Sequence, residues 1–144
     1  MNRKVTDILS RKQASLISVQ SGAPVIDALK IMADKNIGSV IVMDDNVYKG
    51  IMTERDYSRK IILLGRSSTE TKVSEIMTAD LPIVSPADTV DHCMQLMSDK
   101  NIRYLPVFEN NSIIGILSIN DVVKETILEQ EETITHLRDY VHST

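Results

Sequence analysis

The chain has no tryptophan, one phenylalanine, one cysteine and no long apolar run. The shortage of aromatic residues leaves isoleucine, valine, leucine and methionine to form the core. A single cysteine, Cys93, excludes an internal disulfide and a zinc site made of cysteines, and it favours a reducing compartment. No apolar run approaches the length that spans a bilayer, and the first residues are charged with no apolar stretch behind them. We therefore expect a cytoplasmic protein with no secretory signal and no membrane partner.

Basic residues are also in short supply, because 16 Lys and Arg face 20 Asp and Glu, for a net charge of −4. Without a long basic run, binding of nucleic acid through a general electrostatic footprint is not expected. The three histidines, His92, His136 and His142, lack the spacing of metal ligands, so no metal site is expected. No nucleophile is accompanied by a base and an oxyanion hole, so no enzymatic activity and no catalytic cofactor are predicted.

What the sequence does contain is a copy of itself. A shift of 65 positions aligns residues 25–63 with residues 90–128 without a gap, and the tetrapeptide Asp-Lys-Asn-Ile occurs at 34–37 and again at 99–102. The approach to each copy also repeats, since 5–10 resembles 73–78. A single copy of about 60 residues would be only marginally stable by itself. We therefore expect an α+β fold in which two β-α-β-β-α repeats pack as a pseudo-two-fold symmetric pair.

Apolar periodicity and turn residues place the elements of each repeat. In the first repeat we predict helices at 25–35 and 54–64 and strands at 16–19, 39–43 and 47–52. In the second we predict helices at 89–99 and from Asn120 onward and strands at 83–84, 104–108 and 113–117. A polar linker is expected at 65–72. The corresponding domains are 8–68, 73–132 and a C-terminal helix extension at 133–144.

The last helix is longer than its counterpart in the first repeat. Along it, residues spaced alternately by four and three positions form a seam that is apolar at every position but one. Its members are Val123, Ile127, Gln130, Ile134, Leu137 and Val141. One interpretation is a helix folded onto its own domain. The other is a helix that packs on a second subunit as a short coiled-coil seam. The pattern is too short to decide between them.

Each repeat contains the motif Gly-apolar-apolar-Thr/Ser-x-x-Asp, from Gly50 to Asp56 and from Gly115 to Asp121. A single copy is typical of a helix start, where the hydroxyl accepts a hydrogen bond from a backbone N–H of the first turn. The same atoms suit a nucleotide, because a hydroxyl and a helix N-terminus can meet a phosphate and an acceptor-only aspartate can bind ribose hydroxyls. Two copies in register favour the second interpretation.

The gapless repeat, the two motifs and the segment Arg103-Tyr-Leu-Pro-Val107 resemble a tandem pair of CBS domains. The segment Thr53-Glu-Arg-Asp-Tyr57 and the tail Thr133-Ile-x-x-Leu-x-x-Tyr140 resemble, more closely, stand-alone bacterial proteins made of one CBS pair and a C-terminal helix. This resemblance implies adenosine-containing ligands, such as AMP, ADP, ATP, NAD or S-adenosylmethionine, in a cleft between the repeats.

Carried over by motif, the resemblance implies two sites that each combine residues of both repeats. The first predicted site would comprise Thr53, Arg55, Asp56, Ile83, Ile102 and Arg103. The second predicted site would comprise Ser118, Asn120, Asp121, Ile17, Ile37 and Gly38. The four isoleucines would sandwich the adenine, the two aspartates would hold the ribose, and Thr53, Ser118, Arg55 and Arg103 would meet phosphate.

The first predicted site has two arginines where the second has Asn120 and Gly38. Arginine pairs with phosphate through charge-assisted, often bidentate bonds. We therefore expect the first site to hold phosphorylated ligands more tightly than the second.

The predicted function is a regulatory module that senses an adenosine nucleotide. The resemblance also implies a homodimer, either head-to-head or head-to-tail, and a separate regulated protein as partner. The alternative is a dimeric protein-interaction module whose nucleotide sites are vestigial.

Overall fold

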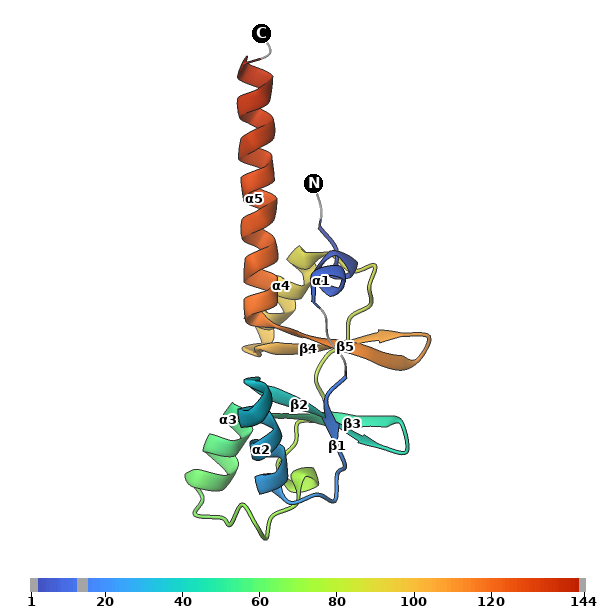
Figure 1. Cartoon of the computed structure of the whole chain (residues 1–144), viewed down its shortest axis with the longest axis vertical. Helices are drawn as coiled ribbons and strands as arrows, with labels where there is room; N and C mark the ends of the chain where they lie inside the picture. The colour runs from blue at the N-terminus through green and yellow to red at the C-terminus, as the bar shows by residue number, and fades with distance from the viewer. Residues whose placement is uncertain (1–2, 13–15, 143–144) are drawn as a thin grey trace. The chain divides into compact units, whose positions relative to one another are not determined.

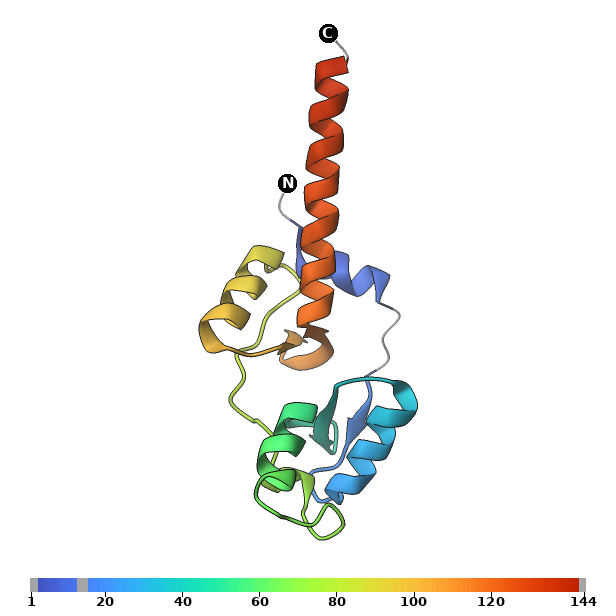
Figure 2. The same ribbon diagram turned by 90° about the vertical axis from the view of Figure 1, so that its left-hand side faces the viewer.

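Two short sheets, one in each repeat, organise the computed structural model, which describes residues 3–12 and 16–142 (Figures 1 and 2). The elements gather into two units. We call Leu16–Leu81 the central unit, and we call the described residues on either side of it, 3–12 and 82–142, the terminal unit. The predicted α+β class with two repeats and a long C-terminal helix is confirmed.

The central unit is built on a three-stranded sheet of order β1-β2-β3. Strand β1 runs parallel to β2, and β2 pairs with β3 as an antiparallel hairpin. Helix α2 connects β1 to β2, and the chain after β3 turns directly into helix. The elements are β1 Ser18–Val19, α2 Val25–Lys35, β2 Ser39–Asp44, β3 Val47–Thr53, α3 Glu54–Tyr57, the π-helical turn η1 Ser58–Ile62 and the 3-10 turn η2 Val73–Glu75.

The terminal unit repeats this plan with a two-stranded antiparallel sheet. Its elements are α1 Val5–Arg11, α4 Val90–Lys100, β4 Tyr104–Glu109, β5 Ser112–Ser118 and α5 Ile119–His142. Within this unit α5 extends well beyond α1 and α4 (Figure 1). Among the helices of the described residues, none combines the length and the apolar character needed to cross a membrane.

The two units agree in backbone detail at positions 65 residues apart. Asn36 and Asn101 end α2 and α4 in the left-handed conformation, with φ of 53° and 54°. Asparagine is one of the few residues that adopts this conformation readily. Both hairpins also carry a register shift at the same place and a turn with two positive-φ residues, at Val42/Met43 with Asp45 and Asn46, and at Val107/Phe108 with Asn110 and Asn111.

Two of the expected elements differ in the structure. The strand expected at 83–84 is a single parallel bridge between Val84 and Val107. Pro82 and Pro86 flank it and have no N–H to extend the ladder, which explains its shortness. The helix expected at 54–64 is interrupted, because α3 gives way to a π-helical turn in which the Leu63 N–H donates to the Ser58 carbonyl.

The segments 5–10 and 73–78, which repeat in sequence, form α1 and η2, and these elements were not predicted. Each closes an apolar core. Val5 and Ile8 are buried in the core of the terminal unit, and Val73 and Ile76 are buried in the core of the central unit. The polar linker 65–72 also packs against the central unit, since the Val25 N–H donates to the Thr71 carbonyl at 2.8 Å.

The repeated glycine at the start of each motif marks a close approach of these segments. Ile51 and Thr78 exchange two backbone hydrogen bonds, at 3.0 and 2.9 Å. A Cβ on Gly50 would lie 2.7 Å from the Thr78 carbonyl oxygen, closer than atoms can approach. A Cβ on Gly115 would meet only the flexible end of Leu9, at 3.2 Å. The glycine of the central unit is therefore required by backbone packing.

We predict that Gly50→Ala destabilises the protein by about 1–3 kcal/mol, because the added methyl group pushes the backbone at Thr78 away. Gly115→Ala is expected to be near neutral, since the Leu9 side chain can rotate. The free energies of unfolding from denaturant titration test this, with Gly22→Ala as a control at a site where nothing lies within 4 Å. Equal effects at positions 50 and 115 would contradict the packing argument.

Candidate functional site

The motif of the central unit forms a capped helix start. Thr53 is the N-cap of α3, and its Oγ1 accepts a hydrogen bond from the Asp56 N–H at 3.1 Å. In return the Thr53 N–H donates to Asp56 Oδ2 at 2.9 Å. The helix-start interpretation of this motif is therefore confirmed, and any ligand would use atoms that already serve the cap.

Asp56 is buried and surrounded by donors. Besides the cap, its Oδ2 accepts from Thr53 Oγ1 at 3.0 Å, and its Oδ1 accepts from Thr78 Oγ1 at 3.1 Å. The Lys60 ammonium lies 3.0 Å from Oδ1 and also donates to the Ile76 carbonyl at 2.8 Å. Four donor groups thus contact a carboxylate that offers about four acceptor positions.

The motif of the terminal unit has the same cap with fewer contacts on the carboxylate. The Ser118 N–H donates to Asp121 Oδ2 at 2.8 Å, and the Asp121 N–H donates to Ser118 Oγ at 3.2 Å. The Lys12 ammonium donates to the same Oδ2 at 2.7 Å and to the Ile116 carbonyl at 2.8 Å. The Asp121 side chain is 20% exposed, against 9% for Asp56. Asp121 is therefore the more accessible of the two carboxylates.

Electrostatics around Asp121 favour its ionised form. Burial by itself would raise the pKa of Asp121, but the hydrogen bond and the charge of Lys12, with the hydrogen bonds from Ser118, outweigh it. The pKa therefore lies below its ordinary value of 3.8. An ionised carboxylate that only accepts hydrogen bonds is the form that suits a ligand hydroxyl.

The two aspartates receive their lysines from different parts of the chain. Lys60 lies one turn after Asp56 in the sequence, a spacing that places two side chains side by side. The equivalent position of the second repeat is Glu125, whose carboxylate cannot pair with an aspartate. Lys12, which follows the end of α1 and is 109 residues away in the sequence, donates to Asp121 instead. Sequence reasoning missed both lysines, and only the four-residue spacing of Lys60 offered a signal.

The remaining predicted residues lie at one sheet edge in each unit. In the central unit this edge joins the starts of β1 and β2 to the end of β3. The Ile17 carbonyl accepts from the Ile41 N–H at 3.1 Å, and the Gly38 carbonyl accepts from the Glu54 N–H at 3.1 Å. The structure thus brings together six of the predicted residues there: Ile17, Ile37, Gly38, Thr53, Arg55 and Asp56.

The same edge of the terminal unit holds the other six. The Arg103 carbonyl accepts from the Ile119 N–H at 2.8 Å, and Tyr104 pairs with Ser118 in the sheet. Arg103 and Asn120 are exposed, and the Ile83 side chain is 55% exposed. The members are Ile83, Ile102, Arg103, Ser118, Asn120 and Asp121. The combination of three residues from one set with three from the other stays a prediction.

The cysteine and the possible metal ligands lie outside these two sets of residues. Cys93 is fully buried in the core of the terminal unit, and burial raises the pKa of its thiol to about 11. A thiol with this pKa is not a nucleophile at neutral pH. Across residues 3–12 and 16–142, no group of three or more His, Cys, Asp or Glu side chains is placed to hold a metal ion.

Comparisons with known proteins agree on one family. The family model described as CBS domain matches residues 5–63 and 73–127. The CBS domain-containing protein CBSX3, mitochondrial, of Arabidopsis thaliana is 43% identical over 122 residues, which cover 81% of this chain and 59% of that protein. The chain thus spans less than two thirds of that relative's length.

Solved structures share the fold. A CBS-domain protein from Burkholderia ambifaria is 43% identical with a TM-score of 0.84, covering 88% of this chain and 96% of that one. The CBS domain pair of protein MJ0100, in complex with 5′-methylthioadenosine and S-adenosyl-L-methionine, is 24% identical with a TM-score of 0.78. The match covers 90% of this chain and 99% of that one.

We predict that Lys12→Met raises the pKa of Asp121, because burial then acts without the compensating ammonium. In the wild type the folded-state pKa lies below the unfolded one. Ionised Asp121 therefore adds stability above its ordinary pKa, and this stability is lost as the pH falls through the folded-state value. In the variant the folded-state pKa moves up toward the unfolded one, so ionised Asp121 adds less stability. NMR titration of the Asp121 carboxyl carbon measures the shift.

Lys12→Arg serves as the charge-preserving variant and Lys30→Met as a charge-matched change at an exposed site of the central unit. Both should leave the pKa of Asp121 low. An unchanged titration in Lys12→Met would show that the contact with Lys12 has no electrostatic role.

Proposed function

The chain belongs to the CBS-domain family, and on that premise we propose that it is a regulatory module that binds an adenosine-containing ligand and catalyses no reaction. The candidate ligands are AMP, ADP, ATP, NAD and S-adenosylmethionine. The observation that carries this proposal is the pair of capped aspartates, Asp56 and Asp121. They lie in register in the two repeats, each in contact with a lysine ammonium.

The two carboxylates would recognise ribose. A carboxylate accepts hydrogen bonds only, and the two hydroxyls of ribose are donors. Asp121 has the greater exposure and fewer donors around it, which supports it as the more readily engaged partner. At Asp56 a ribose hydroxyl would replace one of the existing donors, and Thr78 Oγ1 at 3.1 Å is a candidate because a hydroxyl can turn to another acceptor.

Apolar side chains at the same edges would take the adenine. Ile17 and Ile37 pack partly against the core of the central unit, and Ile102 packs against that of the terminal unit. Ile83 is an exposed isoleucine, with more than half of its surface accessible to solvent. Covering such apolar surface with a flat base is favourable by about 25 cal/mol per Å² removed from water.

Regulation would follow from differential affinity. A ligand can shift the conformation of a protein only as far as it binds one arrangement better than another. We infer a separate regulated protein as the recipient of this shift, since we assign no catalytic role to the chain itself.

A second function is favoured by one observation, the exposed apolar face of α5 described below. It fits a protein-interaction module in which nucleotide binding has been lost. The two functions differ in whether the motif aspartates bind anything.

The central experiment is a thermal-melt panel with AMP, ADP, ATP, NAD, NADH and S-adenosylmethionine. A ligand at a hundred times its dissociation constant should add about 2.7 kcal/mol to the stability of the folded state. We expect at least one ligand to raise the melting temperature of the wild type and not that of the Asp56→Asn/Asp121→Asn double variant.

Because Asp56 is buried, the double variant also needs circular dichroism to show that it is folded. Arg103→Gln is a second variant that does not disturb a core, because Arg103 is exposed. Its ligand affinity can be measured by isothermal titration calorimetry. If no ligand in the panel shifts the wild type, the sites are vestigial and the interaction function stands.

The arginines predict a difference between the two sites. Arg55 and Arg103 belong to the first predicted site, and the second has Asn120 and Gly38 in their place. The lysines do not distinguish the sites, because Lys60 contacts Asp56 and Lys12 contacts Asp121. We propose that the first site holds phosphorylated ligands more tightly. Asp56→Asn should therefore weaken AMP binding more than Asp121→Asn does.

Arg103→Gln should lower AMP affinity roughly tenfold or more, as expected for a charge-assisted hydrogen bond, and leave adenosine affinity unchanged. Arg59→Gln, an exposed arginine outside both sets, is the matched control. Equal loss of AMP binding in the two aspartate variants would contradict the predicted difference.

A further inference from the structure

Helix α5 has an inner face that holds it to the terminal unit. Val122 and Glu125 on this face are buried. Arg3 donates to Glu125 at 2.6 Å and also to Glu132, and Arg11 donates to the second oxygen of Glu125. The inner face is therefore committed to contacts within its own unit.

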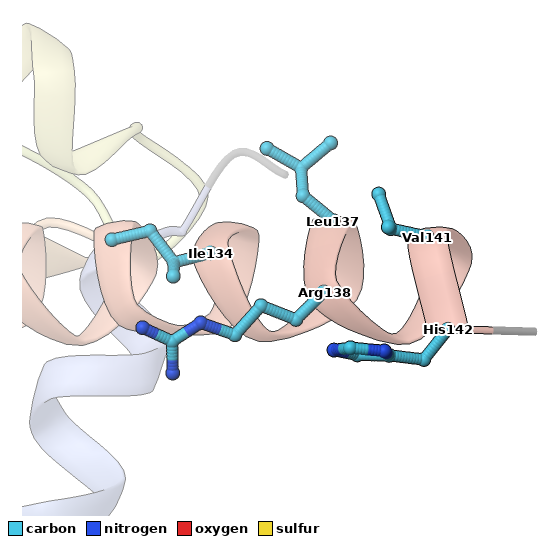
Figure 3. A pocket seen from close by; sticks show the side chains of 5 residues that line it. All are labelled: Ile134, Leu137, Arg138, Val141 and His142. Carbon is cyan, nitrogen blue, oxygen red and sulfur yellow. The ribbon is translucent and has the colours of Figure 1, made fainter.

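The opposite face carries an exposed apolar stripe. We call it the α5 stripe, and its members are Val123, Ile127, Gln130, Ile134, Leu137 and Val141. The five apolar side chains are 40–66% exposed. Figure 3 shows Ile134, Leu137 and Val141 along one face of the helix, with Arg138 and His142 along its edge. All five residues around this shallow depression belong to α5, so it is a helix face and not an enclosed cavity.

The geometry of the helix separates the two faces. At about 100° per residue, the stripe is centred on the side opposite Val122, Glu125 and Glu132. The terminal unit contacts the inner face and therefore leaves the stripe uncovered. Of the two interpretations that the seam allowed, the exposure favours packing on another molecule over folding onto the helix's own domain.

We propose that the α5 stripe pairs with the same stripe of a second copy of this chain as a parallel two-stranded coiled coil. The spacing by four and three places Ile127, Ile134 and Val141 at a positions and Val123, Gln130 and Leu137 at d positions. β-branched residues at all three a positions, with a leucine at one of the d positions, favour two strands among parallel coiled coils.

The polar member of the stripe supports the same orientation. In a parallel pair Gln130 meets Gln130 of the other copy, and the two amides can hydrogen-bond to each other. In an antiparallel pair that overlaps the full stripe, each Gln130 would lie opposite Ile134 of the other copy, which leaves a buried amide without a partner.

Charges beside the stripe are compatible with this pairing. The e positions hold Lys124, Glu131 and Arg138, and the g positions hold neutral Thr126, Thr133 and Tyr140. A parallel pair brings e of one helix beside g of the other, so no like charges oppose. Because each terminal unit lies on the inner face of its own helix, two terminal units would project away from the seam.

The stripe is short for a coiled coil, because it spans fewer than three heptads. Here the first turns of α5 are already ordered by Val122 and Glu125. Association therefore does not bear the cost of helix nucleation, and we expect a dimer that dissociates on dilution. The inference is independent of nucleotide binding.

Disulfide trapping in a Cys93→Ala background tests the seam. Gln130→Cys should form a cross-linked dimer about tenfold faster, or more, than Asp139→Cys, because only the first pair of thiols can reach disulfide distance. Asp139 lies about two and a half turns further along α5, on the face opposite the stripe, and is the control. Equal rates would overturn the proposal.

Mixing Val123→Cys chains with Val141→Cys chains, both in the Cys93→Ala background, tests the orientation, because these residues lie at the two ends of the stripe. Predominant 123–123 and 141–141 products support the parallel pair, whereas predominant 123–141 products overturn it in favour of an antiparallel one.

Sedimentation of the uncross-linked protein completes the test. At high protein concentration we expect a dimer for the wild type and a monomer for Ile134→Glu/Leu137→Glu. The control Thr135→Glu/His136→Glu adds the same two glutamates at exposed positions away from the stripe and should leave the dimer intact. A wild type that stays monomeric at every concentration, or a dimer that survives the stripe variant, would overturn the proposal.

Discussion

Both apolar cores depend on one constraint, which is that a repeat of about 60 residues is too small to bury a full core alone. A short helical segment closes each core. Val73 and Ile76 close the core of the central unit although the sequence places them before the second repeat. Val5 and Ile8 close that of the terminal unit although the sequence places them before the first. Each short segment thus packs on the repeat other than the one it precedes in the sequence, and we call this the exchange of segments. The close approach of Gly50 to Thr78 and the ion pairs beside α1 both follow from it.

The exchange also explains how the repeats have diverged in charge. In the central unit the motif aspartate is neutralised from within its own helix, by Lys60. In the terminal unit the position equivalent to Lys60 is Glu125. The segment 3–12, which contains α1, supplies Arg3 and Arg11 to Glu125 and Lys12 to Asp121. A buried acid needs such partners, because an uncompensated charge in a core is strongly destabilising. The two units thus place a lysine ammonium beside the motif aspartate by different routes.

The sequence predicted most of the regular elements because they depend on local patterns. The shift of 65 residues, the apolar periodicity and the asparagine turns led to α2, α4 and both hairpins. The motif spacing likewise led to the capped pairs Thr53–Asp56 and Ser118–Asp121. The role of α1 was missed because its partners lie more than 70 residues away and leave no local trace. The single bridge at Val84 is different, since the flanking prolines were visible and their effect on a ladder could have been anticipated.

The course of the chain has a consequence for its synthesis. The central unit is one continuous stretch inserted into the terminal unit, whose two parts it separates. Arg3 and Glu125 are 122 residues apart, so their contact belongs to the slow class of long-range contacts. On the ribosome, α1 emerges first and its core partners in α4 and α5 emerge last. All the core residues of the inserted unit, including Val73 and Ile76, have been synthesised once residue 81 has emerged. Until α4 and α5 have been synthesised, the apolar side chains of α1, Val5 and Ile8, have no core to pack into.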